Sequence, residues 1–282
     1  MTSSDLNLKE VEYEIKPAGK LSLNLKEIWQ YRELFYFFTW RDIKVKYKQA
    51  YLGIAWVIIQ PLFMMVVFSV FFGRLLKVPS DGIPYPIFVY SGMMLWNIFS
   101  SGLSSSGDSM VSNANILKKI YFPRLIIPVS AIIVSVFDFL ITFLLFIVLL
   151  FVFQFKVDVI RFTYLFPLAL IIVLMTTLGL GTLLSSLNIK YRDFRYVIPF
   201  LIQSTLFVTP VIYPVSVLAY PWAKYILAIN PLTGAISLSR AAIIGSAVDW
   251  NLVVISLLCS LFLLLNGVLV FKKNEAYFAD LA

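Results

Sequence analysis

Long apolar runs constrain this chain more than any other feature of its sequence. The hydrocarbon core of a bilayer is about 30 Å thick, so a helix that crosses it needs roughly 20 apolar residues. Six runs of about that length carry few charges, at residues 54–72, 86–103, 125–153, 164–187, 197–218 and 252–271. With 60% hydrophobic and 13% charged residues, the chain has more apolar surface than a water-facing fold can bury. The sequence therefore predicts an all-α integral membrane protein whose residues 51–272 form one domain of six transmembrane helices.

The basic residues predict which side of the membrane each loop occupies. Six spans place both termini on one side, and that side would carry 17 Lys and Arg residues against six on the other. Because cytoplasmic loops carry the excess of Lys and Arg, we expect a multi-pass protein of the cytoplasmic (inner) membrane with both termini cytoplasmic. Residues 1–25 form a polar N-terminal arm, paired as a strand or disordered, without the features of a secretory signal peptide. Residues 273–282 form a cytoplasmic tail.

Residues 26–50 have the pattern of an interfacial amphipathic helix. Charged and amide side chains gather within about 120° of a helical wheel, and most aromatic side chains lie opposite. The polar set is Lys26, Glu27, Gln30, Glu33, Arg41, Lys44 and Lys48, and the apolar set is Ile28, Trp29, Phe35, Tyr36, Phe38 and Trp40. Leu34 and Phe37 lie inside the polar arc, and residues 42–48 also alternate like a strand. We expect a helix at headgroup depth.

Residues 220–250, between the fifth and sixth runs, contain two half-length apolar pieces separated by Asn230-Pro231. Each piece is too short to cross a bilayer. Irregular backbone at membrane depth is tolerated only where protein or water covers it. The pattern favours a re-entrant hairpin that lines a pathway, and the alternative is a peripheral loop on the outer surface.

The chain lacks the residues that most catalytic and metal sites need. It has no histidine and one cysteine, Cys259, which excludes an intrachain disulfide and argues against zinc and redox chemistry. It has no phosphate-binding P-loop, because its one Gly-Lys pair, Gly19-Lys20, has Glu14 where the first glycine should be. The basic loops explain the net charge of +8 better than nucleic-acid binding does. We expect no enzymatic activity, no metal and no cofactor in this chain, so ATP-driven transport would require another subunit.

The predicted cytoplasmic loop at residues 112–123 has the pattern of a short amphipathic helix. Ile116, Leu117, Ile120 and Tyr121 share one face, Lys118 and Lys119 are displaced from it, and Pro123 ends the run. Such a helix docks into a groove of a cytoplasmic partner or lies on the membrane, and the residues alone leave both open. The second basic loop, at residues 188–196, is typical of a juxtamembrane anchor.

Polar side chains inside the runs mark positions that face protein or water rather than lipid. Asp138 is the only carboxylate deep inside a run, and it indicates either a substrate or proton site or a hydrogen-bonded contact between helices. Gln60, Asn97 and residues 203–205 supply uncharged donors and acceptors, which connect helices as often as they line a pore. The same runs carry rings that suit sugar stacking, at Trp56, Phe63, Phe200, Phe207 and Tyr213.

Several segments, in order along nearly the whole chain, together resemble one family. They are WRDIKVKYKQ at residues 40–49 with Leu52-Gly53, Trp56 and QPL at 60–62; NILKKIYFP at 115–123; YRD at 191–193; TPVIYP at 209–214; NPL at 230–232; and FAD at 278–280. The family is the membrane-spanning permease of ABC transporters that export cell-surface polysaccharides such as O-antigen, capsule and teichoic acid. Each fragment is modestly specific, and their order and spacing carry the resemblance.

The resemblance implies a homodimer that pairs with two cytoplasmic ATPase subunits, which bind ATP and Mg, and that exports a lipid-linked polysaccharide through a channel between the protomers. It implies an ATPase coupling helix made of Ile116, Leu117, Lys118, Lys119, Ile120 and Tyr121. The resemblance also implies a candidate substrate path that comprises Trp56, Gln60, Phe63, Phe200, Gln203, Phe207 and Tyr213. The cytoplasmic entrance would include Trp29, Arg32, Trp40 and Arg41, and an outer gate at residues 220–244 would include Tyr220, Trp222, Asn230 and Pro231.

Two rival functions remain. An exporter of the same fold could carry drugs or other lipids, and it would leave surface glycan unchanged when deleted. A membrane-embedded transferase acting on lipid-linked sugars would need clustered carboxylates or histidine, and this chain has neither histidine nor an Asp-x-Asp pair. Lone Asp138 also argues against ion-coupled transport.

Overall fold

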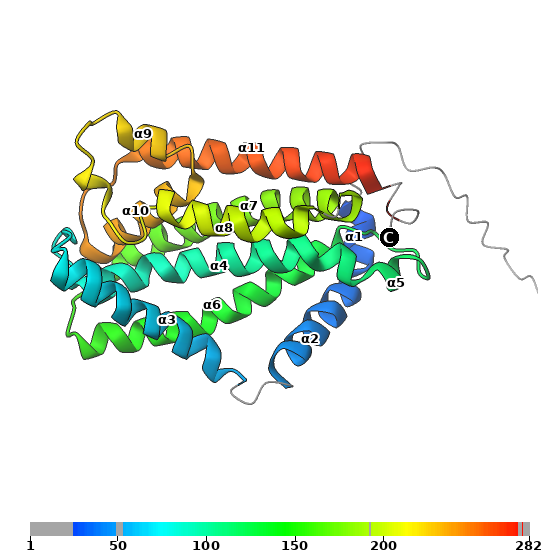
Figure 1. The fold of residues 1–282 in the computed structure, drawn as a ribbon, viewed down its shortest axis with the longest axis horizontal. Coiled ribbons are helices and arrows are strands. Elements are labelled where there is room, and N and C mark those ends of the chain that lie inside the picture. Colours follow the sequence, from blue (N-terminus) through cyan, green and yellow to red (C-terminus); the bar gives the residue numbers. More distant parts are fainter. Residues whose placement is uncertain (1–24, 49–52, 192, 276–277, 279–282) are drawn as a thin grey trace, which may run out of the picture.

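A computed structural model describes residues 25–48, 53–191, 193–275 and 278, and all regular secondary structure in these residues is helical (Figure 1). Apart from Leu25, the predicted arm at 1–25 lies outside the described residues, as does most of the tail at 273–282. The long helices run along the long axis of the molecule. The short helices α9 (Ala223–Leu227) and α10 (Pro231–Ile244) lie at one end, and α1 (Leu25–Gln30) and α5 (Ala114–Leu117) lie at the other.

Four helices in the described part of the chain are long and apolar enough to cross a membrane. The first is α3 (Ala55–Phe68), continued by the π-helix η1 (Ser69–Leu75). The others are α6 (Ile126–Val152), α7 (Val159–Lys190) and α11 (Trp250–Asn274). They coincide with the predicted first, third, fourth and sixth runs, and α7 extends beyond its predicted bounds at both ends. Run length therefore predicted these helices correctly.

The predicted second span, 86–103, forms the central helix α4 (Tyr85–Ser112). This helix packs against α6 and α7 along much of its length and also contacts α3, α8 and α10. It is not among the long apolar helices, because its second half continues through a run of serines. Protein rather than lipid covers most of its surface, so polar residues are tolerated there.

The predicted fifth span, 197–218, is wrong in its extent. Helix α8 (Phe194–Val208) has 15 residues and reaches only about 22 Å. It ends because Thr209 has extended backbone and Pro210 and Pro214 lack an N–H for helical hydrogen bonds. A short 3₁₀ helix, η2 (Val215–Val217), follows. Val211 and Ile212, which prolong the apolar run, are buried by protein, and hydropathy cannot distinguish this from burial by lipid.

The predicted amphipathic helix at 26–50 is divided at Tyr31 into α1 and α2 (Arg32–Lys48). Its inward stripe is Tyr31, Leu34, Phe35 and Phe38, which follows the i, i+3, i+4, i+7 pattern of a packed helix face. The predicted single aromatic face is wrong: Leu34 packs inward, whereas Trp29, Tyr36 and Trp40 are exposed. The prediction of a helix in this segment is confirmed for its described residues.

The predicted break at Asn230-Pro231 separates α9 from α10. The Asn230 side chain accepts a hydrogen bond from the Leu232 N–H, and Pro231 occupies the first helical position, so the two residues form a helix start. Helix α10 packs against α7, α11 and α4, with most of its residues buried. It ends at Gly245, whose φ of 75° suits glycine.

Two features hold the bundle together. Helices α7 and α11 lie side by side, and Gly179 of α7 meets Gly267 of α11 with no room for a side chain between them. At the α1/α5 end, a small apolar group that we call the end cluster joins α2, α4, α5, α6, α7, α11 and Phe278. Its buried members are Phe38, Met110, Leu117, Phe122, Leu125, Ile126, Ile127, Ile189, Phe271 and Phe278.

Candidate functional site

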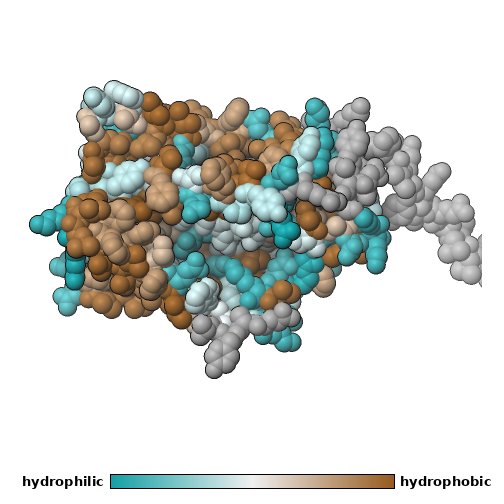
Figure 2. Space-filling model, in the orientation of Figure 1, coloured by the Kyte–Doolittle hydropathy of each residue, from teal (hydrophilic) through white to brown (hydrophobic). Residues whose placement is uncertain are grey.

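A polar cleft of about 430 Å³, the central cleft, lies between α3, α4, α6 and α8 and reaches the end of α2. Its polar lining consists of Lys46, Gln60, Asn97, Ser100, Ser101, Ser104, Ser135, Asp138, Thr142 and Gln203. Trp56, Phe139 and Ile202 supply apolar walls. Figure 2 shows hydrophilic and intermediate residues at the centre of the drawn face, with hydrophobic residues above and to the left.

Three of the seven predicted path residues line the central cleft. These are Trp56 and Gln60 from α3 and Gln203 from α8. The structure does not place the others there. Phe63, Phe200 and Phe207 are exposed on the outer surface of α3 and α8, and the Tyr213 hydroxyl donates to the carbonyl oxygen of Val208.

Sequence reasoning singled out Asn97 but not the polar stripe on α4 that continues from it through the central cleft. Asn97, Ser101 and Ser104 are spaced by four and three residues, which places them on one helix face. Ser105 and Ser112 continue the same face. The helical spacing of these polar residues was visible in the sequence and could have predicted the stripe. Hydroxyls that faced lipid would have no hydrogen-bond partners except the backbone, so such a face is expected to point towards protein or water.

Asp138 makes the interhelical contact that was one of its two predicted roles. Its carboxylate accepts hydrogen bonds from Lys46 Nζ and Tyr47 Oη, both at the end of α2. The Asp138 side chain is 15% exposed and that of Lys46 is 41% exposed. Pairing offsets the cost of a carboxylate within an apolar helix.

A second cleft of about 590 Å³, the α2 cleft, lies beside α2, α4 and α6 and reaches the start of the loop at residues 112–123. It contains Arg41, Asp42, Lys46, Ser105 and Ile116. Of the four predicted entrance residues, Arg41 alone lines it. The Arg32 guanidinium instead lies over the Trp29 ring, 5.8 Å from its centroid, and Trp40 stacks on Tyr36.

The predicted coupling helix at 116–121 is mostly not helical, because α5 ends at Leu117 and turns follow. The predicted shared face is also divided. Leu117 is buried in the end cluster and Ile116 packs against it, whereas Ile120 is 61% and Tyr121 76% exposed. Lys118 and Lys119 are exposed as well. Arg124, at the end of the loop, connects it to Glu275. The Arg124 backbone N–H donates to the Glu275 carboxylate, and the Arg124 guanidinium donates to the Glu275 backbone carbonyl.

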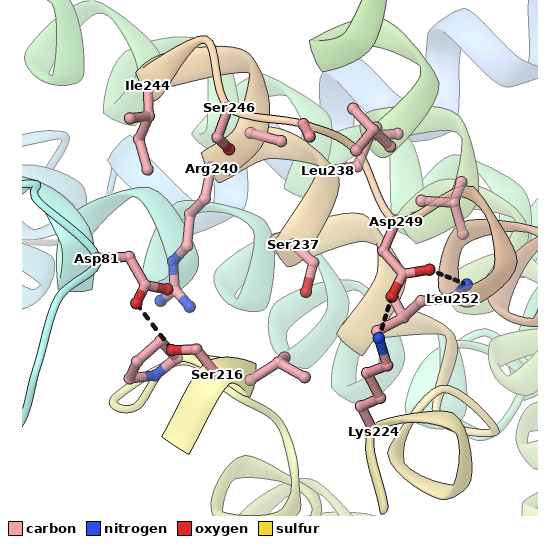
Figure 3. Close-up of a pocket in the computed structure, with 16 residues that line it drawn as sticks. Asp81, Ser216, Lys224, Ser237, Leu238, Arg240, Ile244, Ser246, Asp249 and Leu252 are labelled. Atoms are coloured by element: carbon pink, nitrogen blue, oxygen red, sulfur yellow. Dashed lines mark hydrogen bonds and ion pairs between the residues drawn. The ribbon is translucent and has the colours of Figure 1, made fainter. Parts of the chain in front are cut away.

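At the opposite end of the molecule, a third cleft of about 400 Å³, the α10 cleft, is bordered by two polar pairs (Figure 3). Ser216 donates to Asp81 over 2.8 Å, and Lys224 to Asp249 over 2.5 Å. None of the four predicted gate residues lines this cleft. Tyr220 and Trp222 stack on each other at the surface, Asn230 donates to Thr209 Oγ1, and Pro231 is buried.

Arg240 of α10 is buried beside this cleft, and sequence reasoning treated it only as an outer basic residue. Its guanidinium donates to four backbone carbonyls, those of Phe88, Pro210, Val211 and Tyr213. It also lies over the Phe88 ring, 3.5 Å from the centroid. Arg240 therefore fixes the irregular segment that follows α8.

The Lys224–Asp249 pair offers a test of pH dependence. The hydrogen bond with Asp249 raises the pKa of Lys224, and the hydrogen bond with Lys224 lowers the pKa of Asp249. Because the carboxyl pKa is lowered on folding, Asp249 stabilises the fold at pH values above its unfolded pKa of about 3.9. This stabilisation is lost as pH falls through the folded pKa. Because the lysine pKa is raised on folding, Lys224 stabilises the fold at pH values below its unfolded pKa of about 10.4. This stabilisation is lost as pH rises through the folded pKa.

Asp249→Asn is expected to lower the free energy of unfolding at pH 7 by less than about 1 kcal/mol, because the pair is a third exposed. The loss should fade as pH falls through the lowered pKa that Asp249 has in the folded state, because below it the carboxyl is protonated in both states. Asp249→Ala is the matched variant, since it also removes the cap that accepts from the Leu252 N–H and should cost about 1 kcal/mol more. Thermal unfolding of the purified protein measures both, and equal stability of the two variants would contradict the capping role.

No group of three or more His, Cys, Asp or Glu side chains that could hold a metal ion occurs among the residues with described positions. In the described residues, amides, hydroxyls and aromatic rings line the central cleft beside the charged Lys46 and Asp138, and polar and charged side chains line the other two clefts.

Comparison with known proteins identifies the family. The model of the ABC-2 type transporter family matches residues 33–244, three quarters of the chain. The chain belongs to the ABC-2 type transporter family. Among its curated relatives is the O-antigen export system permease protein RfbA of Klebsiella pneumoniae, 27% identical over 249 residues, which cover 88% of this chain and 95% of the relative.

Two further relatives of this ABC-2 protein carry related names. The O-antigen export system permease protein RfbA of Myxococcus xanthus is 27% identical over 220 residues, covering 77% of this chain and 82% of the relative. The polysialic acid transport protein KpsM of Escherichia coli is 23% identical over 242 residues, covering 83% of this chain and 91% of the relative. The family expected from the sequence segments is thereby confirmed, and the homologues are transport permeases.

Proposed function

We propose that this ABC-2 protein is the permease subunit of an ATP-driven transporter that exports a lipid-linked, O-antigen-like polysaccharide across the cytoplasmic membrane. The observation that carries the proposal is the central cleft, in which amide and hydroxyl side chains lie beside an exposed indole, in a chain homologous to O-antigen export permeases. Sugars present hydroxyls at their edges and apolar C–H groups on their faces. The cleft matches both.

Trp56, Gln60 and Gln203 are the path residues that this geometry supports best. Trp56 is 54% exposed, so its ring is free to stack, while Gln60, Gln203 and Asn97 supply donors and acceptors. The exposed rings Phe63, Phe200 and Phe207 on α3 and α8 then flank the path. A second copy of the chain packed on these helices would close the channel, which is why we propose a homodimer.

The loop at 118–121 would contact a separate ATPase subunit that binds ATP and Mg. Ile120 and Tyr121 project from it with Lys118 and Lys119 beside them, which suits an apolar groove with an acidic rim. The loop and the α10 cleft lie at opposite ends of the molecule. This arrangement supports cytoplasmic termini, six membrane crossings including α4 and α8, and a re-entrant hairpin of α9 and α10 on the outer side.

Ile120→Asp should abolish coupling to the ATPase. A carboxylate placed in an apolar groove with an acidic rim is both desolvated and repelled, so stimulation of ATP hydrolysis and glycan export should each fall at least tenfold. The assay co-expresses the chain with its ATPase and measures ATP hydrolysis in vesicles and glycan at the cell surface.

Ile160→Asp is the matched control, because Ile160 is also exposed and lies in the first turn of α7 at the other end, where an acidic residue suits the helix N-terminus. It should retain export. Normal export by Ile120→Asp would refute the coupling role. If the amount of glycan at the cell surface were unchanged after deletion of the chain, the proposal that the substrate is a glycan would be refuted. That result would favour an exporter of drugs or other lipids.

A further inference from the structure

Two of the clefts meet at one side chain. Lys46, near the end of α2, lines both the central cleft and the α2 cleft, and the polar stripe of α4 continues from one to the other. We propose that the contact of Lys46 and Tyr47 with Asp138 is a latch that holds α2 between the two clefts, and that its release joins them into one passage. The inference rests on the proposed function, because it regulates access to the proposed substrate path.

The latch uses both oxygens of one carboxylate. Lys46 Nζ donates to Oδ2 of Asp138 and Tyr47 Oη donates to Oδ1, so two consecutive residues of α2 bind the middle of α6. An unpaired carboxylate within an apolar helix is unfavourable because it loses its hydration. Helix α2 supplies both partners of this carboxylate. The Tyr47 ring adds packing against Phe137, with centroids 6.1 Å apart.

Few other contacts hold α2 in place. Its main packing partner is α6, and Tyr36, Phe37, Trp40 and Val45 on its other sides are exposed. Apart from the latch, it is attached through its apolar stripe, in which Phe38 is buried in the end cluster and Leu34 and Phe35 pack against that cluster. Phe38 and Lys46 are eight residues apart, or about 12 Å along the helix. Helix α2 is therefore a rigid segment held at an apolar point and a polar point.

The apolar point touches the loop proposed to meet the ATPase. The Phe38 ring packs against Phe122, with centroids 5.7 Å apart, and Phe122 directly follows Tyr121. Leu117, in the same loop, is buried in the same cluster. A displacement of this loop is thus transmitted to Phe38 by direct packing and tilts α2. Hydrogen bonds weaken steeply with distance and angle, so a small tilt at Lys46 and Tyr47 suffices to open the latch.

Two engineered cysteines on α4 test the latch without any transport assay. Ser101 lines the central cleft and Ser105, one helical turn away, lines the α2 cleft. Each is changed to cysteine in full-length Cys259→Ala protein, and inverted membrane vesicles are treated with a charged, membrane-impermeant maleimide. With the latch intact, Ser105→Cys should react fast and Ser101→Cys slowly. Adding Lys46→Gln and Tyr47→Phe should raise the rate at position 101 at least tenfold and change the rate at 105 less than twofold.

Lys44→Gln is the matched control, because Lys44 lies on the same helix but over the Trp40 ring instead of Asp138, 5.0 Å from the ring centroid. It should leave both rates unchanged. The exchange Lys46→Asp with Asp138→Lys keeps an ion pair of reversed polarity and should return the rate at position 101 toward the slow value. A nearly unchanged rate at position 105 in the opened variants shows that they are folded.

The outcomes separate the latch from the proposed function. Equal rates at position 101 with and without the latch residues, or an equal effect of Lys44→Gln, would overturn the latch while leaving export untouched. The expected labelling pattern in a chain whose deletion leaves surface glycan unchanged would support the latch and overturn the export of glycan instead.

Discussion

Gly267→Ala is expected to destabilise the protein by about 3 kcal/mol or more, at the upper end of overpacking effects. Alanine normally stabilises a helix interior by about 1 kcal/mol relative to glycine, so propensity alone gives the opposite sign. Here the added methyl group would overlap the carbonyl oxygen of Gly179 and lie 2.8 Å from Thr182 Oγ1. Backbone atoms cannot rotate away, and α7 and α11 would have to separate.

Thermal unfolding of the purified protein in detergent measures this effect. A loss of about 3 kcal/mol corresponds to a fall in Tm of about 6 °C or more for a chain of this size. Leu265→Ala is the control on the same helix, because Leu265 is exposed and its truncation leaves the crossing intact. A Tm for Gly267→Ala equal to or above that of the unmodified protein would show that the two helices do not cross as described.

Arg240→Met is the second change with a large expected effect. Methionine fills similar space but leaves three carbonyl oxygens, on residues 210, 211 and 213, without their donor, whereas the Phe88 carbonyl keeps the Ser91 hydroxyl. An unsatisfied buried acceptor costs about 1–3 kcal/mol, so we expect a total loss of about 3 kcal/mol or more. The segment after α8 should loosen first, because three of the carbonyls that Arg240 binds belong to it.

Arg240→Lys separates charge from geometry. Lysine keeps the positive charge but cannot span four carbonyls as the planar guanidinium does, so its Tm should lie between those of Arg240→Met and the unmodified protein. Limited proteolysis at residues 209–222 reports the loosening directly. If Arg240→Met unfolds at the normal temperature and resists cleavage there, the carbonyl contacts are not what stabilises this segment.

The sequence predicted the helices whose apolar runs are long, because helix rise and bilayer thickness together fix the required length. It failed at α8, although Pro210 and Pro214 were visible, because Val211 and Ile212 prolong the apolar run. These two residues are buried under α10 and α4 rather than in lipid. Hydropathy records that a residue avoids water, not what covers it.

The site was predicted in part for a similar reason. Gln60 and Gln203 were found because an amide within an apolar run must face protein or water, and both line the central cleft. The rings of Phe63, Phe200 and Phe207 carry no such constraint, since phenylalanine is equally stable against lipid. The partners of Asp138 could not be inferred, because Lys46 is 92 residues away and only the tertiary fold brings them together.

The end cluster also joins residues that lie far apart in the sequence. Phe278 is fully buried there and packs on Phe271, with ring centroids 5.0 Å apart, while Phe38 belongs to α2. The apolar surface that surrounds Phe38 is therefore complete only after residues 271 and 278 have been synthesised. We expect α2 to reach its final position late in folding, after helices that follow it by more than 200 residues.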